Sequence, residues 1–181
     1  MCPVGSGKML KSWPMGLGSS VTLLLLTGPA TAAPPLAFAQ VDHIRVDKSE
    51  RTMTLFGVDG SVTTIDHIQL GDAPVGAKQF EGDERTPEGR FTIDYGNPGS
   101  AYHLSLHIDY PRAQNIAYAR SQGRSPGGAI FIHGQPNDWV GGAVGGRVPG
   151  DWTDGCIALS NEQIEALWGA VADGTPIEIV A

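Results

Sequence analysis

The sequence predicts a single, mainly β domain, a β-sandwich or barrel with one or two short helices. Two observations support this fold class. After residue 40, most of the 181-residue chain falls into short runs in which apolar and polar side chains alternate, which is the pattern of half-buried strands. Only the stretch 161–172 shows clear helical spacing, and it comes late in the chain. A chain of this length suffices for one domain preceded by a leader.

The first three runs predict an antiparallel meander. In Val41–Asp47, apolar residues alternate with charged ones, so one face of a strand would be buried. Met53–Gly57 follows, and Asp59-Gly60 is a hairpin turn signal before the run Ser61–Leu70.

The rest of the chain predicts further strands and a well-marked helix. Ser160 and Gln163 form a capping-box pair, after which apolar residues from Ile164 to Val171 recur at i, i+3, i+4 and i+7. The elements expected after the meander are a charged loop rich in Gly and Pro (78–90), strands (91–95 and 101–110), a short helix (113–122), a buried strand (129–132), a loop with five glycines (141–150), the helix (161–172) and a closing strand (176–180).

The first 39 residues are interpreted as a secretory signal peptide, which leaves residues 40–181 as the mature domain. Lys8 and Lys11 precede an apolar run that glycine and proline interrupt, no acidic residue occurs, and Ala37-Phe38-Ala39 is a small-x-small cleavage pattern. An uncleaved anchor is the alternative, but the run is short for a spanning helix. We therefore expect the periplasm or cell envelope as location, with no stable membrane span after cleavage.

The charge of the mature part disfavours several classes of partner. Residues 40–181 hold ten Lys and Arg against 19 Asp and Glu, so the net charge is 10 − 19 = −9. Nucleic-acid binding requires a basic face, and so does electrostatic attachment to an acidic membrane. We expect no nucleic-acid partner.

Cys156 and His133 are the candidate catalytic residues. The only other cysteine, Cys2, lies in the leader, so Cys156 of a processed chain is either inert and buried or reactive. Gly155 permits a tight turn, and the helix signature at Ser160 predicts backbone N–H groups near the sulfur, which would favour a thiolate and hold an oxyanion. His133 ends a buried strand 23 positions earlier, but spacing alone does not establish a contact.

The sequence around these two residues resembles that of a known family. Ile132-His133-Gly134 followed by Thr153-x-Gly155-Cys156-Ile157 is similar to the signature of the L,D-transpeptidase catalytic domain, the YkuD-type domain. Two upstream segments, Arg85-Thr86-Pro87-Glu88-Gly89-x-Phe91-x-Ile93 and Ser100-x-Tyr102-His103-Leu104-Ser105, also resemble this family. The resemblance covers roughly Val41 to Val180, essentially the whole mature chain.

The resemblance implies an enzyme that acts on peptidoglycan stem peptides in cell-wall biogenesis and cell shape, without a cofactor. Its cysteine attacks the carbonyl of the third stem residue, expels a terminal D-alanine and passes the thioester to an amine, or in some members to water. The roles that it implies are nucleophile for Cys156, general base for His133, orientation of the imidazole by the carbonyl of Gly134, oxyanion donors from Asp154, Gly155 and Cys156, and the Ser/Thr motif position for Thr153.

Two departures from the family pattern leave the acceptor open. Many members have His at the position of Asp154, and Arg or Asn at that of Ala158. This pattern resembles a subgroup in which hydrolysis also occurs. The alternatives are therefore a cysteine hydrolase, either a carboxypeptidase or an endopeptidase that releases a wall-attached protein, and a non-catalytic wall-binding module.

Three further residues, His103, Arg85 and Trp152, are candidates for the substrate cleft. For Arg85, an ion pair with Glu88 that braces the loop is favoured over substrate contact. No metal site is expected, because the histidines lack an accompanying carboxylate or cysteine pattern.

Overall fold

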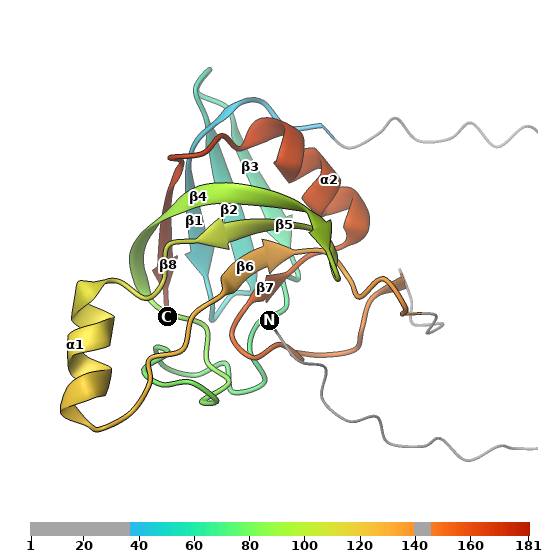
Figure 1. The fold of residues 1–181 in the computed structure, drawn as a ribbon. Helices are drawn as coiled ribbons and strands as arrows, with labels where there is room; N and C mark the ends of the chain where they lie inside the picture. Colours follow the sequence, from blue (N-terminus) through green and yellow to red (C-terminus); the bar gives the residue numbers. More distant parts are fainter. Residues whose placement is uncertain (1–36, 140–145) are drawn as a thin grey trace, which may run out of the picture.

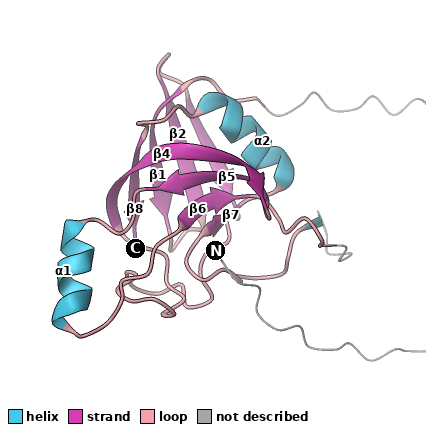
Figure 2. Ribbon diagram, in the orientation of Figure 1, coloured by secondary structure: helices cyan, strands magenta, loops and turns pink. Residues whose placement is uncertain are grey.

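The structure is a computed structural model that describes residues 37–139 and 146–181. Its strands form one curled sheet, and one helix packs on the sheet while the other stands beside it (Figures 1 and 2). The mainly β prediction is confirmed. The elements are β1 (Val41–Asp47), β2 (Thr52–Gly57), β3 (Val62–Asp66), β4 (Gly89–Ser100), β5 (His103–Ile108), α1 (Ala113–Ser121), β6 (Ile130–His133), β7 (Ile157–Ala158), α2 (Asn161–Ala170) and β8 (Pro176–Val180).

The eight strands follow the order β3-β2-β1-β8-β4-β5-β6-β7. The predicted meander is confirmed, since β1 pairs with β2 and β2 with β3, both antiparallel. β3 is shorter than expected because His67 takes a left-handed φ of 58°. β8 lies between the meander and the rest of the sheet, parallel to β1 and antiparallel to β4.

The curl brings the segment after β3 to the opposite edge of the sheet. Gln69 forms an antiparallel bridge with Ala158 in β7, and Gly71 forms a parallel bridge with Thr153. These bridges draw the sheet toward a barrel, so the chain around Thr153 is held between two parts of the fold.

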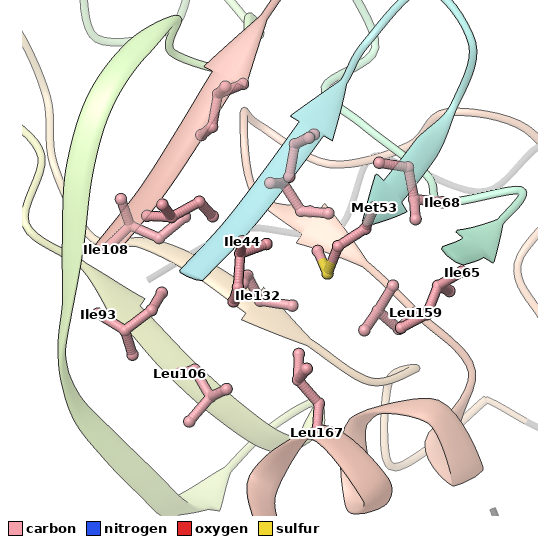
Figure 3. Packing of buried hydrophobic residues seen from close by; sticks show 14 of the residues in the cluster. Ile44, Met53, Ile65, Ile68, Ile93, Leu106, Ile108, Ile132, Leu159 and Leu167 are labelled. Carbon is pink, nitrogen blue, oxygen red and sulfur yellow. The ribbon is translucent and has the colours of Figure 1, made fainter. Parts of the chain in front are cut away.

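The hydrophobic core lies inside the curl and beneath α2. Figure 3 shows Ile44, Ile93 and Ile132 from the sheet and Leu167 from α2 directed toward one interior, and each is at most 1% exposed. Burial of one such side chain stabilises the fold by about 1.5–3 kcal/mol. The core therefore fixes β6, the strand that carries His133.

The N-terminus of α2 carries the predicted capping box. The Ser160 hydroxyl accepts from the Gln163 N–H at 3.2 Å, and the Gln163 Oε1 accepts from the Ser160 N–H at 2.9 Å. The helix ends at Ala170, two residues before the expected limit, because Val171 is extended (φ −104°, ψ 120°).

Most of the proposed leader, residues 1–36, and part of the glycine-rich loop, residues 140–145, lie outside the described residues. Within residues 37–139 and 146–181, no helix has the length and apolar character needed to cross a membrane. The leader and its cleavage stay predictions.

Candidate active site

Strand β6 carries His133 into a cavity of about 330 Å³. Side chains of a strand alternate between its two faces. Ile130 and Ile132 accordingly enter the core, whereas Phe131 and His133 line the cavity together with Ala129 just before the strand. The expectation that a buried strand delivers His133 is confirmed.

The cavity lies on one face of β4, β5 and β6. Asn97, Ser105 and His133 stand opposite one another in the register of the three strands, and all three line it. The same cavity holds Cys156, so the fold brings the two candidate catalytic residues into one site. The lining residues are Asn97, Gly99, Ser100, Ala101, Tyr102, Ser105, Ala129, Phe131, His133 and Cys156.

The imidazole of His133 is buried, oriented and neutral. Only 1% of the residue is exposed, and Nδ1 lies 2.7 Å from the carbonyl oxygen of Gly134. Burial lowers the pKa of His133 to about 4, against the opposing effect of this hydrogen bond. Because a carbonyl only accepts, Nδ1 carries the proton and Nε2 holds a lone pair. Nε2 has no hydrogen-bond partner in the described structure, so it is placed to accept a proton.

Two aromatic rings exclude water from His133. The Tyr102 ring lies 4.6 Å from the imidazole, centroid to centroid, and the Trp152 ring lies 5.6 Å from it. Trp152 was a predicted cleft candidate, whereas Tyr102 was not; regular alternation in the expected strand 101–110 would place Tyr102 on the same face as Leu104. A left-handed φ of 67° at His103 interrupts that alternation just after Tyr102.

The backbone turn before Cys156 is held by Thr153. Its hydroxyl donates to the Cys156 carbonyl at 2.8 Å and accepts from the Gly155 N–H at 3.2 Å. Gly155 has a φ of 125°, and a Cβ there would overlap the carbonyl oxygen of Arg85. The turn therefore requires glycine at 155 and a hydroxyl at 153.

Cys156 does not stand at a helix start, so that part of the sequence-based expectation was wrong. It leads into β7, which pairs in parallel with β6, Ile132 opposite Ile157. The Leu159 N–H donates to the His133 carbonyl at 2.8 Å, and α2 begins only at Asn161. A strand forms here because Ile157 and Ala158 are fully buried beside β6.

Among the three expected oxyanion donors, the Gly155 N–H is already used by Thr153. In this conformation, the role would fall to the N–H groups of Asp154 and Cys156. The carboxyl of Asp154 is partly buried, and burial raises its pKa while the charge of Lys78 opposes this rise.

Cys156 is fully buried, with Sγ 3.6 Å from the carbonyl oxygen of Ala129. It is disulfide-bonded in the 181-residue chain, and there is no free cysteine within the described ranges. The predicted reactive thiol concerns residues 40–181 after leader removal, where Cys156 is the only cysteine. That thiol stays a prediction.

The remaining cleft candidates contact other parts of the fold. His103 Nε2 lies 2.7 Å from Glu165 Oε1 on α2, and His103 is not among the lining residues of the cavity. The expected ion pair between Arg85 and Glu88 was wrong, because Glu88 pairs with Lys48 at 2.8 Å. The backbone of Arg85, rather than its charge, meets the turn at Gly155. No metal-binding cluster of His, Cys, Asp and Glu occurs in the described part of the chain.

Comparison with known protein families matches residues 41–179 to the L,D-transpeptidase catalytic domain, YkuD. A search of curated proteins finds no match. Among solved structures, the chain is similar to the helical cell shape determining protein Pgp2 from Campylobacter jejuni, with TM-score 0.59 and 25% identity over 84% of this chain and 51% of that chain. A mutant of Pgp2 gives TM-score 0.59 and 26% identity over 80% and 48%. An L,D-transpeptidase from Mycobacterium smegmatis gives TM-score 0.49 and 20% identity over 79% and 59%.

The present chain spans about half the length of the Pgp2 chain.

Proposed function

Since this chain belongs to the family of L,D-transpeptidase catalytic domains, we propose that it is an exported peptidoglycan L,D-transpeptidase with Cys156 as nucleophile and His133 as base. One observation supports the proposal: a buried, neutral and oriented imidazole lines the same cavity as the cysteine of the family motif. A nucleophile with a base in one water-poor site is the arrangement that covalent acyl transfer needs.

The proposed first step forms a thioester. His133 Nε2 takes the thiol proton while Sγ attacks the carbonyl carbon of the third stem residue. The N–H groups of Asp154 and Cys156 stabilise the negative oxygen of the tetrahedral intermediate. As the peptide bond breaks, the imidazolium returns the proton to the nitrogen of the departing D-alanine.

The second step transfers the acyl group. The amine of an acceptor stem attacks the thioester, His133 takes its proton, and the thiolate leaves and is reprotonated. The low pKa of His133, caused by burial, favours a neutral thiol and imidazole at rest. Proton transfer therefore accompanies attack and does not precede it.

Intact-protein mass spectrometry after incubation with a stem tetrapeptide tests this proposal. We expect an adduct on Cys156 equal to the tetrapeptide less one D-alanine, and 3–3 crosslinked dimers when an acceptor stem is added. Cys156→Ala should show neither product. A wild-type chain that is reduced, folded and bound to the peptide, yet forms no adduct and releases no D-alanine, would leave a wall-binding module as the better explanation.

Hydrolysis is the second candidate, because Ala158 gives no polar side chain beside the nucleophile. A carboxypeptidase would shorten stems, and an endopeptidase would detach a wall-attached protein. Digested muropeptides separate the candidates: 3–3 dimers indicate transfer, whereas shortened or detached stems indicate hydrolysis. The similarity to a protein that determines helical cell shape supports a role in cell shape for either activity.

A further inference from the structure

Lys78 places a buried positive charge beside the turn that carries Cys156. Its side chain is 4% exposed, and Nζ lies 2.9 Å from Asp83 Oδ1 and 3.4 Å from the carbonyl oxygen of Asp154. Lysine is almost never buried unless its ammonium is paired. Here one partner is a carboxylate of its own loop, and the other is the backbone two residues before the proposed nucleophile.

Asp83 fixes the position of this ammonium. Its Oδ2 accepts from the N–H groups of Gln79 at 2.7 Å and Phe80 at 2.9 Å, and its Oδ1 accepts from the Arg85 N–H at 3.2 Å. Burial acts to raise the pKa of Asp83, but these hydrogen bonds and the one from Lys78 outweigh it and lower the pKa. The carboxylate therefore stays ionised and holds Nζ in one place.

A continuous chain of hydrogen bonds connects Lys78 to Cys156. The ammonium donates to the Asp154 carbonyl, and the N–H of the same peptide unit, on Gly155, donates to the Thr153 hydroxyl. That hydroxyl donates to the carbonyl of Cys156. Hydrogen bonds in such a chain polarise one another, most strongly when a charge stands at its end.

The loop of Lys78 meets the turn at a second point. The Arg85 carbonyl oxygen occupies the space that a side chain at Gly155 would need. The Thr153 carbonyl, in turn, accepts from the Asp72 N–H at 3.0 Å. The turn is thus held on several sides, and Lys78 supplies the charged contact.

We propose that Lys78 is a positioning residue for Cys156. Its ammonium fixes the plane of the Asp154–Gly155 peptide and so the direction in which Sγ and the N–H groups of Asp154 and Cys156 face the cavity. The inference rests on the proposed function, which gives Cys156 the role of nucleophile. The contacts that hold the turn do not depend on which acceptor is used.

Lys78→Met tests the inference, with Lys48→Met as a matched control. The Lys48 side chain is 3% exposed, and its Nζ lies 2.8 Å from Glu88 Oε1 and 2.7 Å from the Gly76 carbonyl. Each variant removes a buried ammonium from a carboxylate and from backbone carbonyl oxygens, which for Lys48 are those of Gly76 and Thr86, but only Lys78 contacts the turn before Cys156. The full-length chain is reduced and treated with iodoacetamide, and peptide mass mapping follows alkylation at Cys156 separately from Cys2.

We expect Lys78→Met to slow alkylation of Cys156 by about tenfold or more, because hydrogen bonds to charged groups are the strong ones. Lys48→Met should change this rate less than about twofold while lowering the melting temperature to a similar extent. If Cys156 is alkylated at the same rate in the two variants, or if Lys78→Met lowers only the melting temperature, Lys78 has a structural role alone.

Asp83→Asn gives a second measurement should Lys78→Met fail to fold. This variant keeps the Lys78 ammonium but replaces the carboxylate that holds it with a neutral amide. Alkylation of Cys156 should therefore slow, but less than in Lys78→Met. An Asp83→Asn chain that folds and reacts at the wild-type rate contradicts the proposal.

D-alanine release then separates this inference from the proposed function. Lys78→Met should lower kcat while KM stays within about twofold. Two results together would separate the two ideas. If the wild-type chain releases no D-alanine, the proposed function is wrong. If Lys78→Met nevertheless slows alkylation of Cys156, Lys78 still positions this cysteine.

Discussion

At the scale of single residues, the site depends on the state of one imidazole. Its Nδ1 is hydrogen-bonded to Gly134, its ring contacts Tyr102 and Trp152, and its Nε2 has no hydrogen-bond partner in the described structure, while the residue lines the cavity that also holds Cys156. Hydrogen bonding by the Gly134 backbone was expected from the family resemblance, and the contact is present. The desolvation by two aromatic rings could not be read from the sequence, because it depends on how distant segments pack.

Removal of His133 and Cys156 together should cost little more than removal of either one. In the proposed mechanism, the base has no function without the thiol, and the thiol is not deprotonated without the base. We expect His133→Ala and Cys156→Ala each to lower kcat for D-alanine release by about 10³-fold or more. The kcat of the double variant should be close to that of the less active single variant. Cys156→Ser should also be nearly inactive, because a hydroxyl is harder to deprotonate than a thiol. Additive losses in the double-mutant cycle would show that the two residues act separately.

The pH dependence of activity should reflect the buried imidazole. Because burial lowers the pKa of His133 to about 4, the base stays unprotonated down to that range. We expect kcat/KM for D-alanine release to keep its value as the pH falls through 6.5 and to decline only near pH 4. A decline centred near 6.5, with the fold intact, would mean that His133 is hydrated or is not the base.

Stability should show the matching effect with a defined sign. The unfolded chain takes up a proton on His133 below about 6.5, whereas the folded chain does so only near 4, so folding becomes less favourable as the pH falls across this window. The difference corresponds to about 3 kcal/mol at most. Urea titrations between pH 7 and 4 measure it, and His133→Ala should lose this part of the slope.

At the scale of elements, the strands with clear alternation were predictable and the short strand β7 was not. The predicted strand Val41–Asp47 has the same first and last residues as β1, because its apolar positions are spaced for one buried face. Ile157–Ala158 gave no alternation to detect, since both residues are buried and only two are paired. The sequence therefore singled out His133 and Cys156, which line one cavity, but associated Cys156 with the helix and not with β7.

The contact between the end of β6 and α2 predicts a strict size limit at Gly134. The role expected from the family resemblance needs only the carbonyl of Gly134, and by itself it would permit serine. In the structure, a Cβ would lie 2.7 Å from Asn161 Oδ1 and 3.1 Å from Ile164 Cγ2, so α2 would have to move. We expect Gly134→Ser to destabilise the fold by about 1–3 kcal/mol, as overpacking does.

Gly169→Ala is the control for this measurement. Gly169 lies in α2, the space that an added Cβ would enter is open, and alanine favours helix by up to about 1 kcal/mol. Urea unfolding should therefore move in opposite directions for the two variants. A Gly134→Ser chain as stable as the wild type would show that α2 adjusts freely.

At the scale of the whole molecule, the state of Cys156 should depend on processing. In the 181-residue chain Cys156 is disulfide-bonded, whereas residues 40–181 contain no second cysteine. We expect chain recovered from the periplasm to begin near Gln40 and to titrate one thiol, whereas reduced unprocessed chain, which also contains Cys2, should titrate two. N-terminal sequencing and thiol titration of both forms measure this. A processed chain without a titratable thiol would contradict the proposed leader or the nucleophile.

The position of β8 in the sheet also has a consequence for how the protein is made. Ile44 of β1 pairs with Ile177 of β8, 133 positions later, and β8 in turn pairs with β4. Within the sheet, β1 and β4 are therefore connected only after residues 176–180 have left the ribosome. Such distant pairings give a high contact order and slow folding. Completion of the sheet therefore follows synthesis of nearly the whole chain, and until β8 is added, strand β4 has no partner on the side away from β5.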